Sequence, residues 1–371
     1  MPYFIKLITI IVAFVGYELA TKNSAIIFGD ALYQFIKIDI LSAAAAMIGL
    51  PVQFMMHEKQ FNIFLPIFIF LSLCIVVPFF YAANLLVLFG IGLLSLYSII
   101  LQNIFVCQNK TSICYIIQFI EGFSKVFIIF LCTIDIINID TIEIIFFLIL
   151  IPIVVIFTLL VGHFNVIKIF RSFRKNFDYR NVGITDLYFS LAILFDNVVK
   201  PLERNLVFLL LGSEMLGVFF IISQISGKVV DFTNVHQTII QPKYISGEKN
   251  SIFSIFTMKV QIAFSLFLLF LMCILPYLGF FNFLENYVFS VFLITVSWFV
   301  LAQDYALVSS VMARKQFLLL LKSKTCFSLI LLGLVFTIRP AELSTYACLF
   351  LLSAASYIVF LLIFARRQLN V

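Results

Sequence analysis

Four charged side chains interrupt a strongly apolar stretch, "LFDNVVKPLERNLVF" (194–208): Asp196, Lys200, Glu203 and Arg204. On an α-helix they fall on one face about 100° wide, where Lys200 can pair with Asp196 or with Glu203. A charge at the centre of a bilayer costs about 2.5–3.5 kcal/mol on insertion scales, so this face needs polar surroundings. The pattern predicts a helix face turned toward a hydrated cavity, in which cations could hold an anion and carboxylates could bind a proton or a cation. The alternative is a set of structural ion pairs that join helices.

Further charges lie in other apolar segments, in both parts of the chain. Lys228 and Asp231 stand three residues apart, and Lys37 and Asp39 stand in a segment near the amino terminus. The remaining ones are Glu18, Glu121, Lys125 and Asp304. We therefore predict two groups of site residues. The substrate-binding cations are Arg204, Lys200, Lys228 and Lys37, and the ion-coupling candidates are Asp196, Asp231, Asp39 and Glu203.

The composition indicates a helical membrane protein. Of 371 residues, 63% are hydrophobic and only 11% are charged, too few to cover the surface of a water-soluble domain of this size. The seven cysteines and three histidines have no metal-ligand spacing. We expect no metal site, no cofactor and no catalytic centre.

Twelve apolar segments of bilayer length predict an all-α polytopic fold with two six-helix halves. They run over 3–20, 28–56, 61–80, 83–106, 113–134, 142–162, 186–211, 215–242, 256–279, 286–311, 317–338 and 343–365. The second is long enough to tilt or kink, and Pro51 near its end permits this. The expected domains are an N-terminal half (1–162), a basic linker (163–185) and a C-terminal half (186–371).

Basic residues concentrate on one side of this arrangement. The connections on that side hold Lys59, Lys110, Lys168, Arg171, Arg174, Lys175, Arg180, Lys243, Lys249, Arg314 and Lys315, and Arg366 and Arg367 follow the last segment. The other side holds Lys22 and Arg339 against Asp135, Asp140, Glu143, Glu214, Glu285 and Glu342. The positive-inside rule places both termini in the cytoplasm. The linker 163–185, basic with aromatic residues between, is expected to lie on membrane lipids in the cytoplasm rather than to bind nucleic acid.

The stretch "ERNLVFLLLGSEMLGVFFIISQISGKVVDFTNVHQTIIQPKYIS" (203–246) resembles the start of the second half of polysaccharide flippases in the MOP superfamily. The matching features are an acidic–arginine pair, a glycine turn into the next helix and a proline further on: Glu203, Arg204, Gly212, Gly217 and Pro242. Phe219 stands where that family usually has tyrosine. The segment "GLPVQFMMHEK" (49–59) is similar to the end of the family's second helix. In size, the chain is most similar to O-antigen flippases of the Wzx type.

This resemblance implies a bacterial inner-membrane flippase that moves an undecaprenyl-diphosphate-linked oligosaccharide from the cytoplasmic to the periplasmic leaflet. Alternating access, H+ or Na+ coupling and a possible polysaccharide polymerase partner are implied with it. A MATE-like multidrug exporter would have the same arrangement of two six-helix halves, but it would favour an anionic, aromatic cavity. A membrane enzyme is the alternative of another class. A polymerase would need a large outer loop, and an acyltransferase would need an embedded histidine with a partner, whereas His236 is the one histidine well inside a segment.

Overall fold

The computed structural model describes residues 2–56, 62–81, 83–161, 171, 183–227, 255–302 and 317–369, and its regular elements are all helices within these ranges. The first group consists of α1 (Pro2–Asn23), α2 (Ala25–Ala45), η1 (Ala46–Ile48), α3 (Gly49–Met56), α4 (Phe64–Phe80), α5 (Leu85–Cys107), α6 (Thr111–Thr133), η2 (Ile139–Thr141) and α7 (Ile142–Val161). The later elements are α9 (Ile184–Ser226), α11 (Ile255–Ile274), η4 (Pro276–Leu278), η5 (Asn282–Tyr287), α12 (Val288–Ala302), α14 (Phe317–Ile338) and α15 (Leu343–Leu369).

The long helices carry the surface of a protein that sits in lipid. Nine segments of the described ranges are long and apolar enough to cross a bilayer. On α1, a stripe of exposed apolar side chains recurs every three or four residues: Phe4, Leu7, Ile11, Val15 and Leu19. In water such a stripe would be an association surface, whereas in a bilayer it is the face that contacts acyl chains. The prediction of an all-α multi-pass membrane protein is confirmed.

Helix α9 is a hairpin with two helical arms rather than one straight rod. Gly212 interrupts its helical backbone angles with φ 86° and ψ −179°, a conformation that glycine adopts without a Cβ penalty. Arg204 and Phe220 each lie eight residues from Gly212, and the guanidinium carbon is 4.8 Å from the centre of the ring. A straight helix would separate these residues by about 24 Å, so the chain doubles back at Gly212. The predicted glycine turn between two segments is therefore present.

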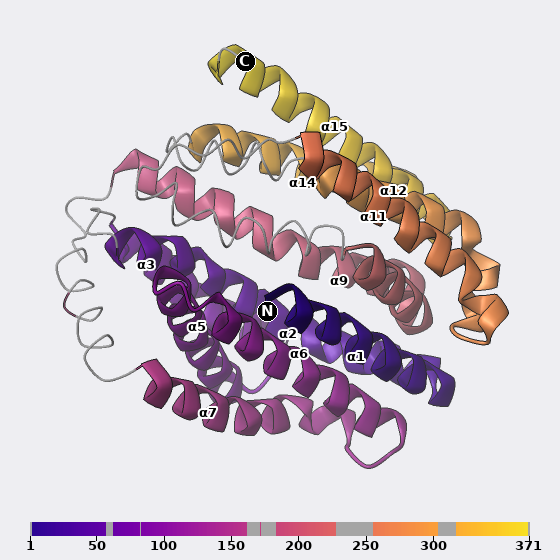
Figure 1. Cartoon of the computed structure of the whole chain (residues 1–371), viewed down its shortest axis with the longest axis horizontal. Coiled ribbons are helices and arrows are strands. Elements are labelled where there is room, and N and C mark those ends of the chain that lie inside the picture. The colour runs from indigo at the N-terminus through magenta and orange to yellow at the C-terminus, as the bar shows by residue number, and fades with distance from the viewer. Residues whose placement is uncertain are drawn as a thin grey trace.

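The helices gather into two groups (Figure 1). Helices α1 to α7 form the first group, and α9, α11, α12, α14 and α15 form the second, with α9 lying against the first group. The described helices correspond to the twelve predicted segments, although the ends of 215–242 and 286–311 lie outside the described residues. The linker 163–185 also lies outside them, apart from 171 and 183–185, so the domain limits stay a prediction.

Local sequence explains where the first long segments break. Ser24 separates α1 from α2, because its hydroxyl oxygen accepts a hydrogen bond from the amide of Ile27 at 3.2 Å and caps the new helix. Further along, the 3-10 turn η1 divides α2 from α3 just before Pro51. The proline ring crowds the carbonyl of residue 47 and removes one amide donor, which disfavours a regular helix there. The regular helix is thus interrupted before Pro51, and the tilt or kink that this proline permits stays a prediction.

The two groups are in close contact where α2 passes the turn of α9. A Cβ atom built on Gly29 would lie 2.0 Å from the carbonyl oxygen of Ser213. Phe28, next to Gly29, packs against Gly217. The ring centroids of Phe28 and Phe220 are 6.3 Å apart. This approach brings the backbones of α2 and α9 together, as small residues do between membrane helices.

We expect Gly29→Ala to destabilise the protein by about 1–3 kcal/mol, because the added methyl group must displace backbone rather than a flexible side chain. The measurement is the thermal unfolding midpoint of the purified protein in detergent. Gly333→Ala is the matched control, since a Cβ at this position of α14 meets no atom within 4 Å. An unchanged midpoint for Gly29→Ala would contradict the close contact of α2 with α9.

Candidate functional site

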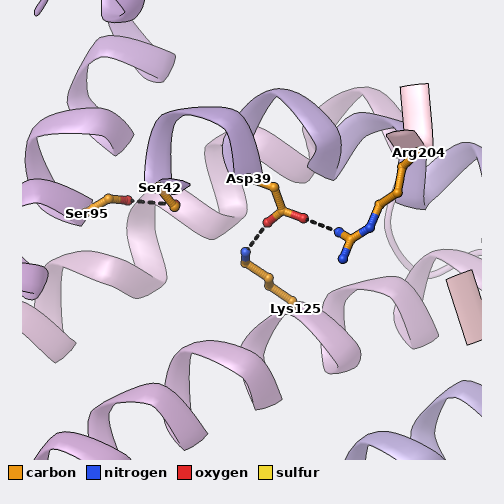
Figure 2. Close-up of polar contacts among 5 residues, drawn as sticks. All are labelled: Asp39, Ser42, Ser95, Lys125 and Arg204. Atoms are coloured by element: carbon orange, nitrogen blue, oxygen red, sulfur yellow. Dashed lines mark hydrogen bonds and ion pairs between the residues drawn. The ribbon is translucent and has the colours of Figure 1, made fainter. Parts of the chain in front are cut away.

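The central feature is a carboxylate shared by two cations inside the membrane. Asp39 of α2 binds the ammonium of Lys125 from α6 through one oxygen at 2.5 Å. Its other oxygen accepts a hydrogen bond from the guanidinium of Arg204 in α9 at 2.7 Å. Figure 2 shows the Asp39 side chain between the two, while Ser42, on the same helix, turns toward Ser95 of α5. Each carboxylate oxygen has its own cation, and the three groups together carry one excess positive charge.

Aromatic rings border both cations of this Asp39 cluster (Asp39, Lys125 and Arg204). The guanidinium of Arg204 lies over Phe220. The ammonium of Lys125 lies 5.5 Å from the ring centre of Phe146 and 5.9 Å from that of Phe35. Ring faces attract cations in a region with little water. The aromatic rings therefore stabilise the two cations in addition to the attraction of the Asp39 carboxylate.

The Asp39 cluster joins the two groups of helices. Asp39 and Lys125 belong to the first group, whereas Arg204 stands on the first arm of α9, 165 residues away in sequence from Asp39. All three side chains are largely buried, with 17–25% of their surface exposed. A motion that separates α2 from α9 would break the Asp39–Arg204 pair and leave the Asp39–Lys125 pair intact.

Other charged groups in the described helices are also paired. Lys37, on another face of α2, forms an ion pair with Glu143 in the first turn of α7. Glu18 of α1 binds Lys22 at 2.9 Å and accepts a hydrogen bond from the amide of Phe281 at 2.8 Å. The first pair lies within one group of helices. The second links α1 to the segment just before η5. It is therefore a contact between the two groups of helices.

The structure brings some of the predicted site residues together and separates others. Asp39 and Arg204 are direct partners, although the sequence suggested different roles for them. Lys37 contacts neither and turns toward α7. Glu203 is buried, and its backbone carbonyl accepts a hydrogen bond from Tyr346 of α15 at 3.4 Å.

Four predicted residues cannot be placed against the cluster. Asp196 and Lys200 lie on the helical backbone of α9, but their side chains lie outside the described residues, as do Lys228 and Asp231 entirely. Lys125 was not among the candidates, although its charge within an apolar segment was visible. Its ion pair with Asp39 requires α2 and α6 to pack side by side, and no local sequence pattern predicts this packing.

Comparison with known proteins gives the fold. No family model matches the chain, and no curated protein matches it. A MATE protein in its straight conformation superposes on it with a TM-score of 0.53 at 12% identity, over 100% of this chain and 96% of that one. The Vibrio cholerae MATE transporter VcmN, in a mutant form, gives 0.55 at 13% identity over 99% and 95%. The chain has the fold of MATE transporters.

A third neighbour extends the likeness beyond MATE proteins. It is a MOP-superfamily transporter from Pyrococcus furiosus, described as having a binding pocket of reversed polarity that suggests a different function. Its TM-score is 0.51 at 10% identity, over 98% of this chain and 95% of that one. At these identities the likeness concerns the fold alone. The predicted MATE/MOP-like architecture is confirmed, and the Wzx subtype belongs to the proposal below.

Proposed function

We propose that the protein is a flippase that moves an undecaprenyl-diphosphate-linked oligosaccharide from the cytoplasmic to the periplasmic leaflet of a bacterial inner membrane. Both termini lie in the cytoplasm in this proposal, because the basic connections are on their side. The fold supports alternating access between two groups of helices. A polysaccharide polymerase would use the exported product as its substrate.

One observation carries the choice of substrate: two cations share a single carboxylate between the groups. When α2 and α9 separate, Arg204 loses its carboxylate partner and presents a planar fork of donors suited to phosphate oxygens. A diphosphate can replace the carboxylate at this position, while its polyprenyl chain stays in lipid. Lys200 and Lys228 are proposed as further cations for the same anion, and Lys37 as one that must first leave Glu143. H+ or Na+ would bind at carboxylates, with Asp39, Asp196, Glu203 and Asp231 as candidates.

The likeness to MATE transporters favours a second candidate, a multidrug exporter of the same fold. The excess positive charge of the Asp39 cluster argues against a cationic drug as the substrate, because like charges repel strongly where little water screens them. An anionic or neutral drug would remain compatible with it.

Deletion of the gene distinguishes the two functions. A flippase defect should remove long surface glycan and cause lipid-linked repeat units to accumulate in the cytoplasmic leaflet, measured by glycan electrophoresis and mass spectrometry of lipid extracts. Complementation with the intact gene is the control. Normal glycan together with reduced dye or drug efflux would contradict the flippase proposal and support the exporter.

A further inference from the structure

Glu121 is a carboxylate inside the helix bundle for which the described residues supply a hydroxyl partner rather than an ion pair. It lies in the middle of α6, and its oxygen accepts a hydrogen bond from the hydroxyl of Ser98 in α5 at 2.5 Å. No ion pair to Glu121 forms within the described ranges, whereas Glu18, Asp39 and Glu143 each bind a lysine. Glu121 is half-buried. A carboxylate that is partly shielded from water and has no bound cation is less stable in its charged form, which favours uptake of a proton.

Hydrogen-bonding side chains lead from Glu121 toward the nearest helix ends. Gln102 donates to the Ser98 hydroxyl at 3.2 Å, and Gln118 donates to the Gln102 carbonyl at 3.1 Å. The thiol of Cys114 stands beside both glutamines, one turn before Gln118. These groups extend toward the connection between Cys107 and Thr111, where α5 ends and α6 begins. Polar atoms along this line can support water molecules that carry protons.

The charged neighbours of Glu121 are few and fixed in position. On α6 itself, Lys125 stands one turn away and Cys114 about two turns away. From α1, Lys6 lies over the ring of Tyr115. From α2 and α7, the nearest charged groups are Asp39, Lys37 and Glu143, which already have partners. Helix α5 supplies no charged side chain between Leu85 and Cys107.

We propose that Glu121 binds and releases a proton during the transport cycle and is the ion-coupling group of the first half. The Ser98 hydroxyl can serve both states, because it donates to the ionised carboxylate and its oxygen can accept from the protonated one. Uptake is a simple addition: one proton from water joins one carboxylate oxygen and the local charge rises by one. The coupling role rests on the proposed transport function, whereas proton binding itself requires no substrate.

The position of Lys125 connects this proton to the Asp39 cluster. With Glu121 ionised, its charge and that of Asp39 balance Lys125 and Arg204. With Glu121 protonated, the four groups carry one excess positive charge, and the attraction that holds Arg204 in place becomes weaker. Proton uptake therefore favours separation of α9 from α2, the movement that alternating access requires.

Difference infrared spectroscopy on the purified protein, without substrate, tests proton binding directly. Wild-type protein should show a protonated-carboxyl band that grows as the pH falls. Glu121→Gln, which keeps an acceptor for Ser98, should lack this band, whereas Glu285→Gln, at an exposed position of η5, should retain it. Ser98→Ala should move the midpoint of the titration to higher pH by about one unit, a tenfold change in proton affinity, because the ionised form loses its donor.

Several outcomes would overturn the proposal. They are a carboxyl band that survives in Glu121→Gln, a midpoint unaffected by Ser98→Ala, or a signal that follows Na+ concentration instead of pH. In vesicles that contain lipid-linked oligosaccharide, the Glu121→Gln protein should no longer respond to an imposed pH gradient. An unchanged response would reject the coupling role even if Glu121 binds a proton. If no oligosaccharide moves with wild-type protein but the infrared result holds, the substrate assignment fails and the proton site stands.

Discussion

Asp39→Ala should prevent the protein from accumulating in the membrane. The substitution leaves Lys125 and Arg204 close together and buried without their shared anion. Removal of one partner from a buried ion pair typically costs about 3–5 kcal/mol, and here the remaining cations also repel each other. That loss is comparable to the whole stability of many domains. Immunoblots of membrane fractions and thermal unfolding in detergent measure the effect.

A second substitution should restore part of the lost stability. Asp39→Ala combined with Lys125→Met removes one of the two stranded cations, so the double variant should be more abundant than Asp39→Ala alone. Asp140→Asn, at an exposed position of η2, should change the unfolding free energy by less than about 0.5 kcal/mol. Normal abundance of Asp39→Ala, or no gain in the double variant, would mean that the carboxylate does not hold these cations in place.

The helices could be predicted from the sequence because a segment that crosses lipid must meet two simple requirements. A crossing segment must hide its backbone polar groups in a helix and present about 20 apolar residues, and both properties are visible locally. The turn at Gly212 was expected from the resemblance to the flippase motif, and the positive φ of this residue explains why glycine stands there. Ser24 and Pro51 also act within a few residues of their own positions.

The pairing of the charges could not be predicted in the same way. Asp39 and Arg204 are joined by the packing of α2 against α9, and Lys37 and Glu143 by the packing of α2 against α7. Glu143 was counted with residues of the outer connections, because the sequence does not show that α7 begins level with the middle of α2. The spacing along the sequence favoured ion pairs within α9, because a helical wheel compares positions only on one helix.

The sharpest test of the site concerns Arg204, since its loss should separate function from folding. In Arg204→Ala, Asp39 keeps Lys125 as a partner, so no uncompensated charge remains and the protein should stay near normal abundance. Export should nevertheless fall about tenfold or more, equivalent to at least about 1.4 kcal/mol of lost anion binding. Lys322→Ala removes an exposed cation from α14 and should affect neither quantity.

Arg204→Lys then shows which property of the side chain matters. Lysine keeps the charge and the attraction to Asp39 but lacks the planar fork that binds phosphate or carboxylate through two parallel hydrogen bonds. Partial export by this variant would indicate a role of charge alone, and no export would indicate bidentate recognition. If Arg204→Ala is instead degraded, and Asp39→Asn in the same chain restores its abundance, Arg204 is a structural partner of Asp39. In that case the anion must bind elsewhere between the two groups of helices.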